Sequence, residues 1–301
     1  MGLSLAAVVA LVVGLLVWQA RSDGASGGSG QAADDVDRTV GVLREKDPVC
    51  EDWWRYGDQL AADTEQWAQV DKSEAASEWT AEQREVFFAA GEAISAAANR
   101  FQEILPQARS PILQILISQS IVYWRQYLER LPNYEPVDGR YAEAGINFAG
   151  AVTFLCTAVP LVPDQGGDER ASRVANPGEL VDFMPTEDVV CSEFLAMVDE
   201  QNAVLGGWAS TDPTVSASQW SDRERLASSA ARKVLAQDAG RARDFSDRTE
   251  NDIFSDLLFT YAAYLSVFSD ALPTYVPDDD HLWKAAIYLG GGLVAACEVS
   301  T

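Results

Sequence analysis

Residues 131–136 read LPNYEP, and residues 272–277 read LPTYVP, so the two stretches stand at an offset of 141 in the numbering. Two prolines so close together end a helix and turn the chain, because proline lacks an amide hydrogen and clashes with the preceding turn. The same offset aligns Cys50 with Cys191 and Cys156 with Cys297 without a gap, and 26 of these 107 positions are identical. Unrelated segments of ordinary composition would share about 6–7. The sequence therefore predicts an internal duplication whose shared turn residues are Pro132, Tyr134 and Pro136, and Pro273, Tyr275 and Pro277.

A second shared motif reads WTAEQR at residues 79–84 and WSDRER at residues 220–225. Ser or Thr followed three residues later by Gln or Glu is typical of a capping box, in which two unpaired amides at a helix start are satisfied reciprocally. An apolar residue before the cap usually packs on the fourth helical residue, which here is an arginine, so an indole–guanidinium contact is one expectation. The alternative is that each tryptophan is simply a core residue. The residues of this motif are Trp79, Thr80, Gln83 and Arg84, and Trp220, Ser221, Glu224 and Arg225.

The four cysteines contain no CxxC pair. The apolar segment at residues 1–18, described below, predicts that the chain is exported. An even number of cysteines in an exported chain predicts two disulfides, formed outside the cytoplasm. Four cysteines allow three connectivities, and the equal spacing of 106 in the numbering favours Cys50–Cys156 and Cys191–Cys297. Four buried free thiols are the alternative.

The chain begins with an apolar segment and a flexible tether. Residues 1–18 carry no charged side chain and reach about 27 Å as a helix, enough for a short membrane span. We predict a transmembrane anchor at 1–20, a Gly/Ser linker at 21–38, a helical repeat at 39–160, a linker at 161–180 and a second repeat at 181–301. This organisation indicates a single-pass protein of the cytoplasmic membrane with extracytoplasmic C-terminal domains. The alternative is a signal peptide that is cleaved to release a secreted protein.

Each repeat is predicted to be a four-helix bundle, which makes the fold all-α. The first helix is expected to run from the first cysteine to about residue 71 or 211, and no sheet is expected. The third helix carries an apolar stripe wider than one contact face needs, and the fourth carries small residues that allow close helix packing. Part of the third helix is therefore expected to face the other copy, a partner or a lipid-sized cavity. The candidates are Ile117, Ile121, Trp124, Leu128 and Leu265.

The composition excludes some classes of function. The 22 basic and 46 acidic side chains give a net charge of −24, which argues against binding to nucleic acid or anionic lipid. A single histidine, His281, leaves little scope for histidine chemistry. Only four of the basic residues are lysine, a bias that fits a GC-rich, actinobacterial-like genome.

No sequence pattern of a nucleotide-binding loop, zinc protease, hydrolase elbow or EF-hand is present, so no catalytic residue and no cofactor are predicted. The one local cluster of ligand-type side chains is Asp278, Asp279, Asp280 and His281. It is a weak metal candidate, and acidic groups at this point are better explained as complementing the dipole of the last helix.

These observations favour a non-enzymatic, membrane-tethered protein of the cell envelope that binds a partner protein or an amphiphilic ligand. One alternative is a hydrolase that uses an acid pair on envelope glycans. Another is an extracytoplasmic sensor domain, although no cytoplasmic output domain is present in the sequence.

Overall fold

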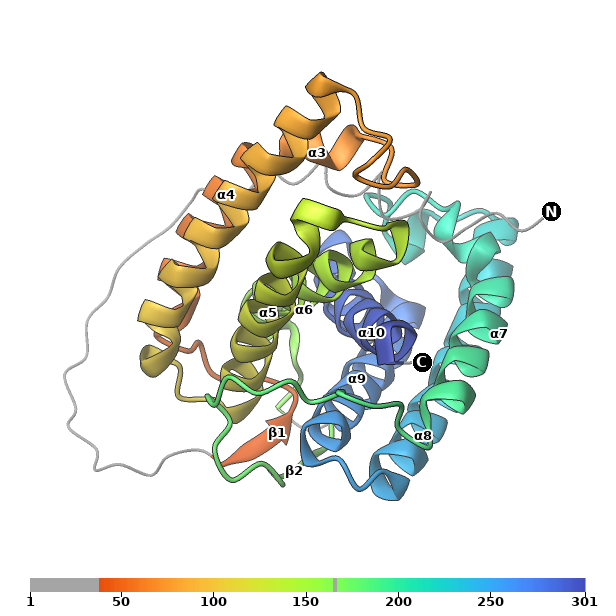
Figure 1. Cartoon of the computed structure of the whole chain (residues 1–301). Coiled ribbons are helices and arrows are strands. Elements are labelled where there is room, and N and C mark those ends of the chain that lie inside the picture. Colours follow the sequence, from red (N-terminus) through yellow and green to blue (C-terminus); the bar gives the residue numbers. More distant parts are fainter. Residues whose placement is uncertain (1–37, 165–166, 301) are drawn as a thin grey trace.

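Helices dominate the computed structural model, which describes residues 38–164 and 167–300 (Figure 1). We call residues 49–158 the N-terminal half and residues 191–300 the C-terminal half. The N-terminal half contains α2 (Val49–Asp63), α3 (Glu65–Gln69), α4 (Ala81–Ile104), α5 (Pro111–Arg130) and α6 (Gly139–Ala158). The C-terminal half contains α7 (Cys191–Ala209), α8 (Asp222–Arg248), α9 (Asp252–Ala271) and α10 (Asp280–Ser300). The predicted anchor at 1–20, and nearly all of the linker at 21–38, lie outside the described residues.

The two halves share one packing scheme. In the N-terminal half α2 and α5 each pack against α4 and α6, and in the C-terminal half α7 and α9 each pack against α8 and α10. Cys50 is bonded to Cys156, which ties α2 to α6, and Cys191 is bonded to Cys297, which ties α7 to α10. The prediction of a mostly helical protein with two disulfides is confirmed.

The expectation that the chain forms no sheet is wrong. A short ribbon pairs β1 (Thr39–Gly41) with β2 (Glu169–Ala171) in antiparallel register, with Thr39 opposite Ala171. Each strand has three residues, too few to show a period of two in the sequence. The ribbon forms because the segment before α2 and the segment after α6 meet in space.

The first helix of the N-terminal half ends earlier than expected. It breaks at Thr64, where φ is −108° and ψ is 8°. The Thr64 hydroxyl donates to the carbonyl of Leu60 at 2.8 Å, and such a bond to the preceding turn bends helices. The aligned residue is Leu205, a good helix former, and α7 continues through it to Ala209.

The two shared motifs make the same bonds in both halves. Both capping boxes form, one between Thr80 and Gln83 and the other between Ser221 and Glu224. At the proline turns, the Tyr134 hydroxyl donates to the carbonyl of residue 72 at 2.9 Å, and the Tyr275 hydroxyl donates to that of residue 213 at 2.8 Å. The indole nitrogens of Trp79 and Trp220 also donate to carbonyls at equivalent positions, those of Glu74 and Val215. Side chains that hold the main chain at the helix ends are thus the ones the two halves share.

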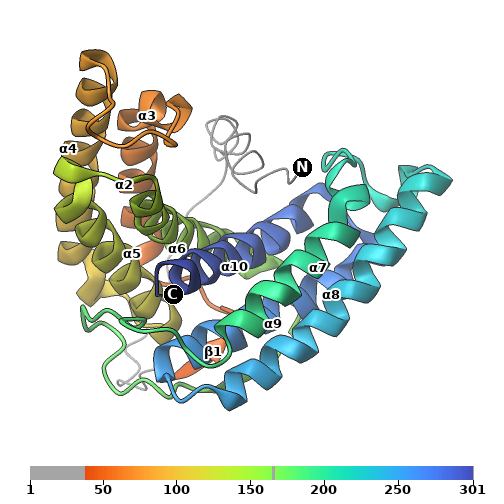
Figure 2. The same ribbon diagram turned by 45° about the vertical axis from the view of Figure 1, so that its right-hand side comes forward.

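Helices α6 and α10 form the central pair, and the other helices diverge from them on either side (Figure 2). They run antiparallel, since Arg140 near the start of α6 lies 2.9 Å from Glu298 near the end of α10. Their contacts are reciprocal. A Cβ on Gly150 would lie 2.3 Å from the ring of Tyr288, and a Cβ on Gly291 would lie 2.8 Å from the side chain of Asn147. Because 150 aligns with 291 and 147 with 288, the two halves meet through the same surface, as in a twofold dimer.

Both central helices are also long and apolar enough to cross a membrane, a test that core helices pass as well. They are half or more buried in this fold and pack on each other. Their apolar character is therefore accounted for by the core that they form.

The segment in front of each half crosses to the other half. Residues 39–43 lie on α9, where the Leu43 amide donates to the Tyr264 hydroxyl at 3.1 Å. Residues 177–184 lie on α5, where the Gln119 side chain donates to the carbonyl of Val181 at 3.1 Å and the ring of Phe183 lies 6.0 Å from that of Tyr123. Each half is thus completed by a segment that precedes the other.

The third helices are therefore covered on more sides than a four-helix bundle requires. Ile117, Ile121, Trp124 and Leu265 are fully buried, and Leu128 is partly buried. Trp124 stacks on Phe101 and fits against Gly145, both in its own half. In the structure the crossing segments lie on both third helices, and the side chains proposed as a binding surface are buried or partly buried.

Candidate functional site

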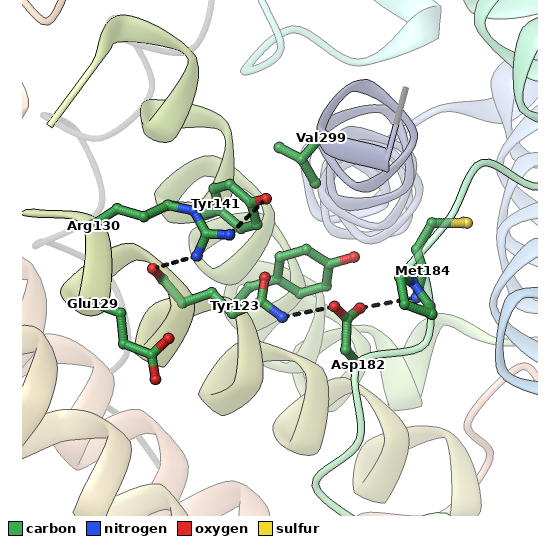
Figure 3. Close-up of a pocket in the computed structure, with 9 residues that line it drawn as sticks. Tyr123, Glu129, Arg130, Tyr141, Asp182, Met184 and Val299 are labelled. Carbon is green, nitrogen blue, oxygen red and sulfur yellow. Dashed lines mark hydrogen bonds between the residues drawn. The ribbon is translucent and has the colours of Figure 1, made fainter.

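A cavity of about 330 Å³ lies where the two halves meet residues 182–185, at the end of the crossing segment on α5 (Figure 3). Helix α5 supplies four of its lining side chains, α6 and α10 supply one each, and the crossing segment supplies the rest. The lining residues are Tyr123, Gln126, Glu129, Arg130, Tyr141, Asp182, Met184, Pro185 and Val299. We call this cavity the inter-half pocket.

Arg130 and Tyr141 form one wall of the inter-half pocket. The guanidinium group lies over the Tyr141 ring, 3.9 Å from its centroid, and donates to the Tyr141 hydroxyl at 3.1 Å. It also donates to the carbonyl of Gln126 at 2.9 Å, and its Nε lies 3.6 Å from the Asp138 carboxylate. The charge of Arg130 is therefore already balanced, and its donors are directed into the protein.

Asp182 forms the opposite wall. One carboxylate oxygen accepts a hydrogen bond from the Met184 amide at 2.9 Å, and the other accepts from the Gln126 side chain at 2.8 Å. Asp182 is exposed, as is Glu129 at the rim. Each carboxylate oxygen has a second lone pair, so this wall has acceptors left for a ligand.

Tyr123 lies at the inner end of the inter-half pocket. Its side chain is 1% exposed, and its hydroxyl has no hydrogen-bond partner among the described residues. Burial, and secondly the charge of Asp182, raises the pKa of Tyr123, so that the hydroxyl stays protonated. A buried hydroxyl without a partner is uncommon because it loses its bonds to water without replacement.

The predicted metal candidates belong to the start of α10. Asp279 accepts from the Val276 amide at 2.9 Å, Asp280 pairs with Lys284 at 2.8 Å, and the ring of His281 stacks beside Phe154. Asp278 lies in the 3₁₀ turn at 277–279 that leads into α10. Within residues 38–164 and 167–300, no group of three His, Cys, Asp or Glu residues could hold a metal ion.

The arginines of the capping motif behave differently in the two halves. Arg84 lies over the indole of Trp79 at 5.7 Å, as expected. Arg225 instead pairs with Asp222 at 3.2 Å, while Trp220 stacks on Tyr275. These residues serve the fold, and none of them lines the inter-half pocket.

The most buried carboxylates of the described residues are engaged in separate places. Asp256 is fully buried on α9 and bonds to Arg170, Ser172 and the Arg173 amide. Asp238 on α8 bonds to Gln201 on α7, with Arg241 alongside. Burial raises the pKa of both carboxyl groups. Neither faces the inter-half pocket, so they do not form the acid pair that a glycan hydrolase would need.

A search for motifs does not find the inter-half pocket, but an alignment of the two halves contains a signal for it. At the offset of 141, Gln126, Glu129 and Arg130 on α5 align with Val267, Asp270 and Ala271. The polar side chains of α5 at two of these positions therefore have small or apolar counterparts, which marks a place where the halves differ.

The fold and the site define a class of protein: helical, held by two disulfides, with a small polar pocket between two similar halves. Residues 31–301 match the sequence profile of the mycobacterial ESX-1 associated proteins, so the chain belongs to that family. An uncharacterised protein of Mycolicibacterium smegmatis (strain MKD8) is 26% identical over 279 residues, which cover 89% of this chain and 74% of that protein. No solved structure matches the chain.

Proposed function

We propose that this protein is a non-enzymatic, membrane-tethered component of the cell envelope that binds a protein partner of the ESX-1 secretion system. The observation that carries the proposal is the pair of disulfides, each closing a separation of 106 residues. Such bonds persist outside the reducing cytoplasm. Together with membership of the ESX-1 associated family, they favour the extracytoplasmic side of the membrane, with the apolar residues 1–18 as the anchor.

The two similar halves support the proposal. We infer that they arose by duplication, because the main-chain bonds of both motifs recur at equivalent positions of the two halves. The C-terminal half keeps the main-chain bonds of both motifs, but most of its other side chains differ from those of the N-terminal half. A repeated scaffold with altered side chains suits recognition of a partner better than a reaction.

A protein partner is favoured over an amphiphile. The inter-half pocket is lined mainly by polar and charged side chains. A second, shallow and open depression, next to Gln114 and residues 175–179, is likewise bordered by Asn and Glu. Lipid-binding pockets are predominantly apolar, and the apolar stripe of the third helix is already covered.

Topology can be tested with an alkaline phosphatase reporter fused after Thr301 in a mycobacterial host. We expect an active reporter, because the enzyme needs an oxidising compartment. A matched fusion to a cytosolic protein gives the background. An inactive, cytosolic fusion would contradict the proposed location.

Partner binding can be tested with the full-length, affinity-tagged chain by photo-crosslinking in living cells. We expect a crosslinked protein that is present in a host with an intact ESX-1 system and lost when that system is deleted. The same crosslinks in both hosts, or none in either, would overturn the proposed association.

A further inference from the structure

The inter-half pocket has a counterpart in the C-terminal half that the chain itself fills. Tyr264 is the residue that aligns with Tyr123, and its hydroxyl accepts a hydrogen bond from the Leu43 amide. Leu43 belongs to the crossing segment on α9, as Met184 belongs to the crossing segment on α5. The offset of 141 aligns these two residues as well, so the Met184 amide is the donor that Tyr123 would be expected to have.

The two halves differ in the residue two positions before this donor. Asp182 aligns with Gly41, which has no side chain. The Asp182 carboxylate accepts the Met184 amide at 2.9 Å, a common local bond of aspartate in turns. The Met184 amide is therefore unavailable to Tyr123, and the hydroxyl is left without a partner.

The carboxylates around the inter-half pocket that have no cationic partner in the part of the chain that the structure describes favour a positively charged ligand. Asp182 and Glu129 are exposed carboxylates, whereas the charge of Arg130 is balanced by Asp138 at 3.6 Å and its face is taken by Tyr141. The wall thus carries a net negative charge and unused acceptors. The overall charge of −24 adds a long-range attraction for cations.

We infer that the inter-half pocket receives a lysine or arginine side chain of the partner protein, held by Asp182 and Glu129. A cavity of about 330 Å³ is at the lower end of the range for small-ligand pockets. It suits one long side chain better than a folded element. The Tyr123 hydroxyl points toward the space between Val299 and Met184 (Figure 3). The Met184 side chain is unbranched and flexible, so it can move aside to let the ligand reach this hydroxyl. This inference rests on the proposed function, because it names the chemistry of the partner.

The charge preference can be tested with two probes on the full-length protein in detergent. The probes are N-acetyl-arginine methylamide and its neutral isostere N-acetyl-citrulline methylamide, followed by NMR of ¹³C-labelled tyrosine rings. We expect the arginine probe to shift the Tyr123 signal and the citrulline probe to leave it unchanged. Equal shifts with both probes would overturn the inference.

Variants locate the binding. Asp182→Asn removes the charge but keeps an oxygen for the Met184 amide, and we expect it to weaken the arginine probe about tenfold, the loss of one charge-assisted hydrogen bond. Asp212→Asn is the matched control, since Asp212 makes the same kind of bond to the Thr214 amide outside the pocket. Unchanged binding by Asp182→Asn, or an equal loss in Asp212→Asn, would contradict the assignment.

The crosslinking experiment separates this inference from the proposed function. If the ESX-1-dependent partner crosslinks to the normal chain but several-fold less to Asp182→Asn, both stand. If the partner crosslinks equally to both chains, the pocket assignment is wrong and the proposed function stands. If no partner crosslinks to the normal chain, the proposed function fails, and so does the assignment of a partner side chain to the pocket.

Discussion

The N-terminal and C-terminal halves share the bonds of their capping boxes and proline turns and differ in much of their interiors. The Trp79 ring stacks on Phe87 at 4.0 Å, whereas the residue aligned with Phe87 is Ser228 and Trp220 packs on Trp208. Both tryptophans also pack on the tyrosine of their proline turn, Tyr134 or Tyr275. In the C-terminal interior, Asp238 and Gln201 form a buried polar pair where the N-terminal half has Ala97 and Leu60. A hydrogen bond from a side chain to the main chain requires a particular residue type at its position. Packed apolar side chains can be exchanged together if the total volume is kept.

The largest expected effect is the loss of either disulfide. Both bridges close a separation of 106 residues, so Cys50→Ser/Cys156→Ser and Cys191→Ser/Cys297→Ser should each lower the free energy of unfolding by about 4–5 kcal/mol. Denaturant unfolding measures the loss, after non-reducing peptide mapping has verified the pairing. A link between Cys156 and Cys191 would contradict the pairing. Clearly unequal losses from the two double variants would show that loop length does not set the effect.

Next in size is truncation of the third helices. Trp124 and Leu265 align and are both fully buried, so Trp124→Ala should cost about 3–5 kcal/mol and Leu265→Ala about 2–5 kcal/mol. Thermal and denaturant unfolding of the two variants provide the measurement. Leu226→Ala is a control, since Leu226 is 74% exposed. A stable Trp124→Ala variant would show that Trp124 does not belong to the core.

The reciprocal glycines of the central pair should respond unequally. A methyl group at Gly150 meets the rigid ring of Tyr288 at 2.3 Å, whereas at Gly291 it meets the end of the short Asn147 side chain at 2.8 Å. We expect Gly150→Ala to cost about 1–3 kcal/mol through overpacking. The gain in helix propensity, about 1 kcal/mol, is common to both sites. Gly291→Ala should cost less because the Asn147 side chain can rotate, at the loss of its bond to the Glu143 carbonyl. A larger loss for Gly291→Ala than for Gly150→Ala would contradict this ranking.

The smallest expected effect is a pH dependence of the free energy of unfolding that comes from His281, in the C-terminal half. Burial, and secondly Lys284, lowers the pKa of His281 from its ordinary 6.5, whereas the aligned residue is Arg140. The unfolded chain therefore takes up a proton more readily than the folded protein. The free energy of unfolding should fall as the pH decreases from 6.5 toward the lowered pKa. His281→Gln should flatten this part of the profile, and because the chain has one histidine, an unchanged profile would disprove the assignment.

The helix ends were predictable from the sequence because their signals are local. Thr80 with Gln83 and Ser221 with Glu224 lie three residues apart, and the proline turns occupy six residues. The break at Thr64 and the β1–β2 ribbon were missed, since one depends on a single side-chain bond and the other on segments that are far apart in the chain. The apolar stripe of α5 was recognised as too wide for one core, but what covers it could not be known.

The inter-half pocket escaped prediction for the same reason. Tyr123 in the sequence looks like one more core aromatic residue, and Asp182 looks like part of a linker. Only the crossing of residues 177–184 onto α5 brings them together. A comparison of the two halves position by position, with Asp182 against Gly41, would have marked the site.

The crossing segments also determine the order in which the protein can assemble during synthesis. Leu43 leaves the ribosome early, but its partner Tyr264 follows 221 residues later. The apolar residues around Leu43 must remain without their native neighbours while most of the chain is made, and contacts so distant in sequence slow folding. The N-terminal half likewise waits for residues 177–184 to cover α5. Each half therefore completes its packing only when the other is present, and a chaperone that shields the early segment would act before α9 appears.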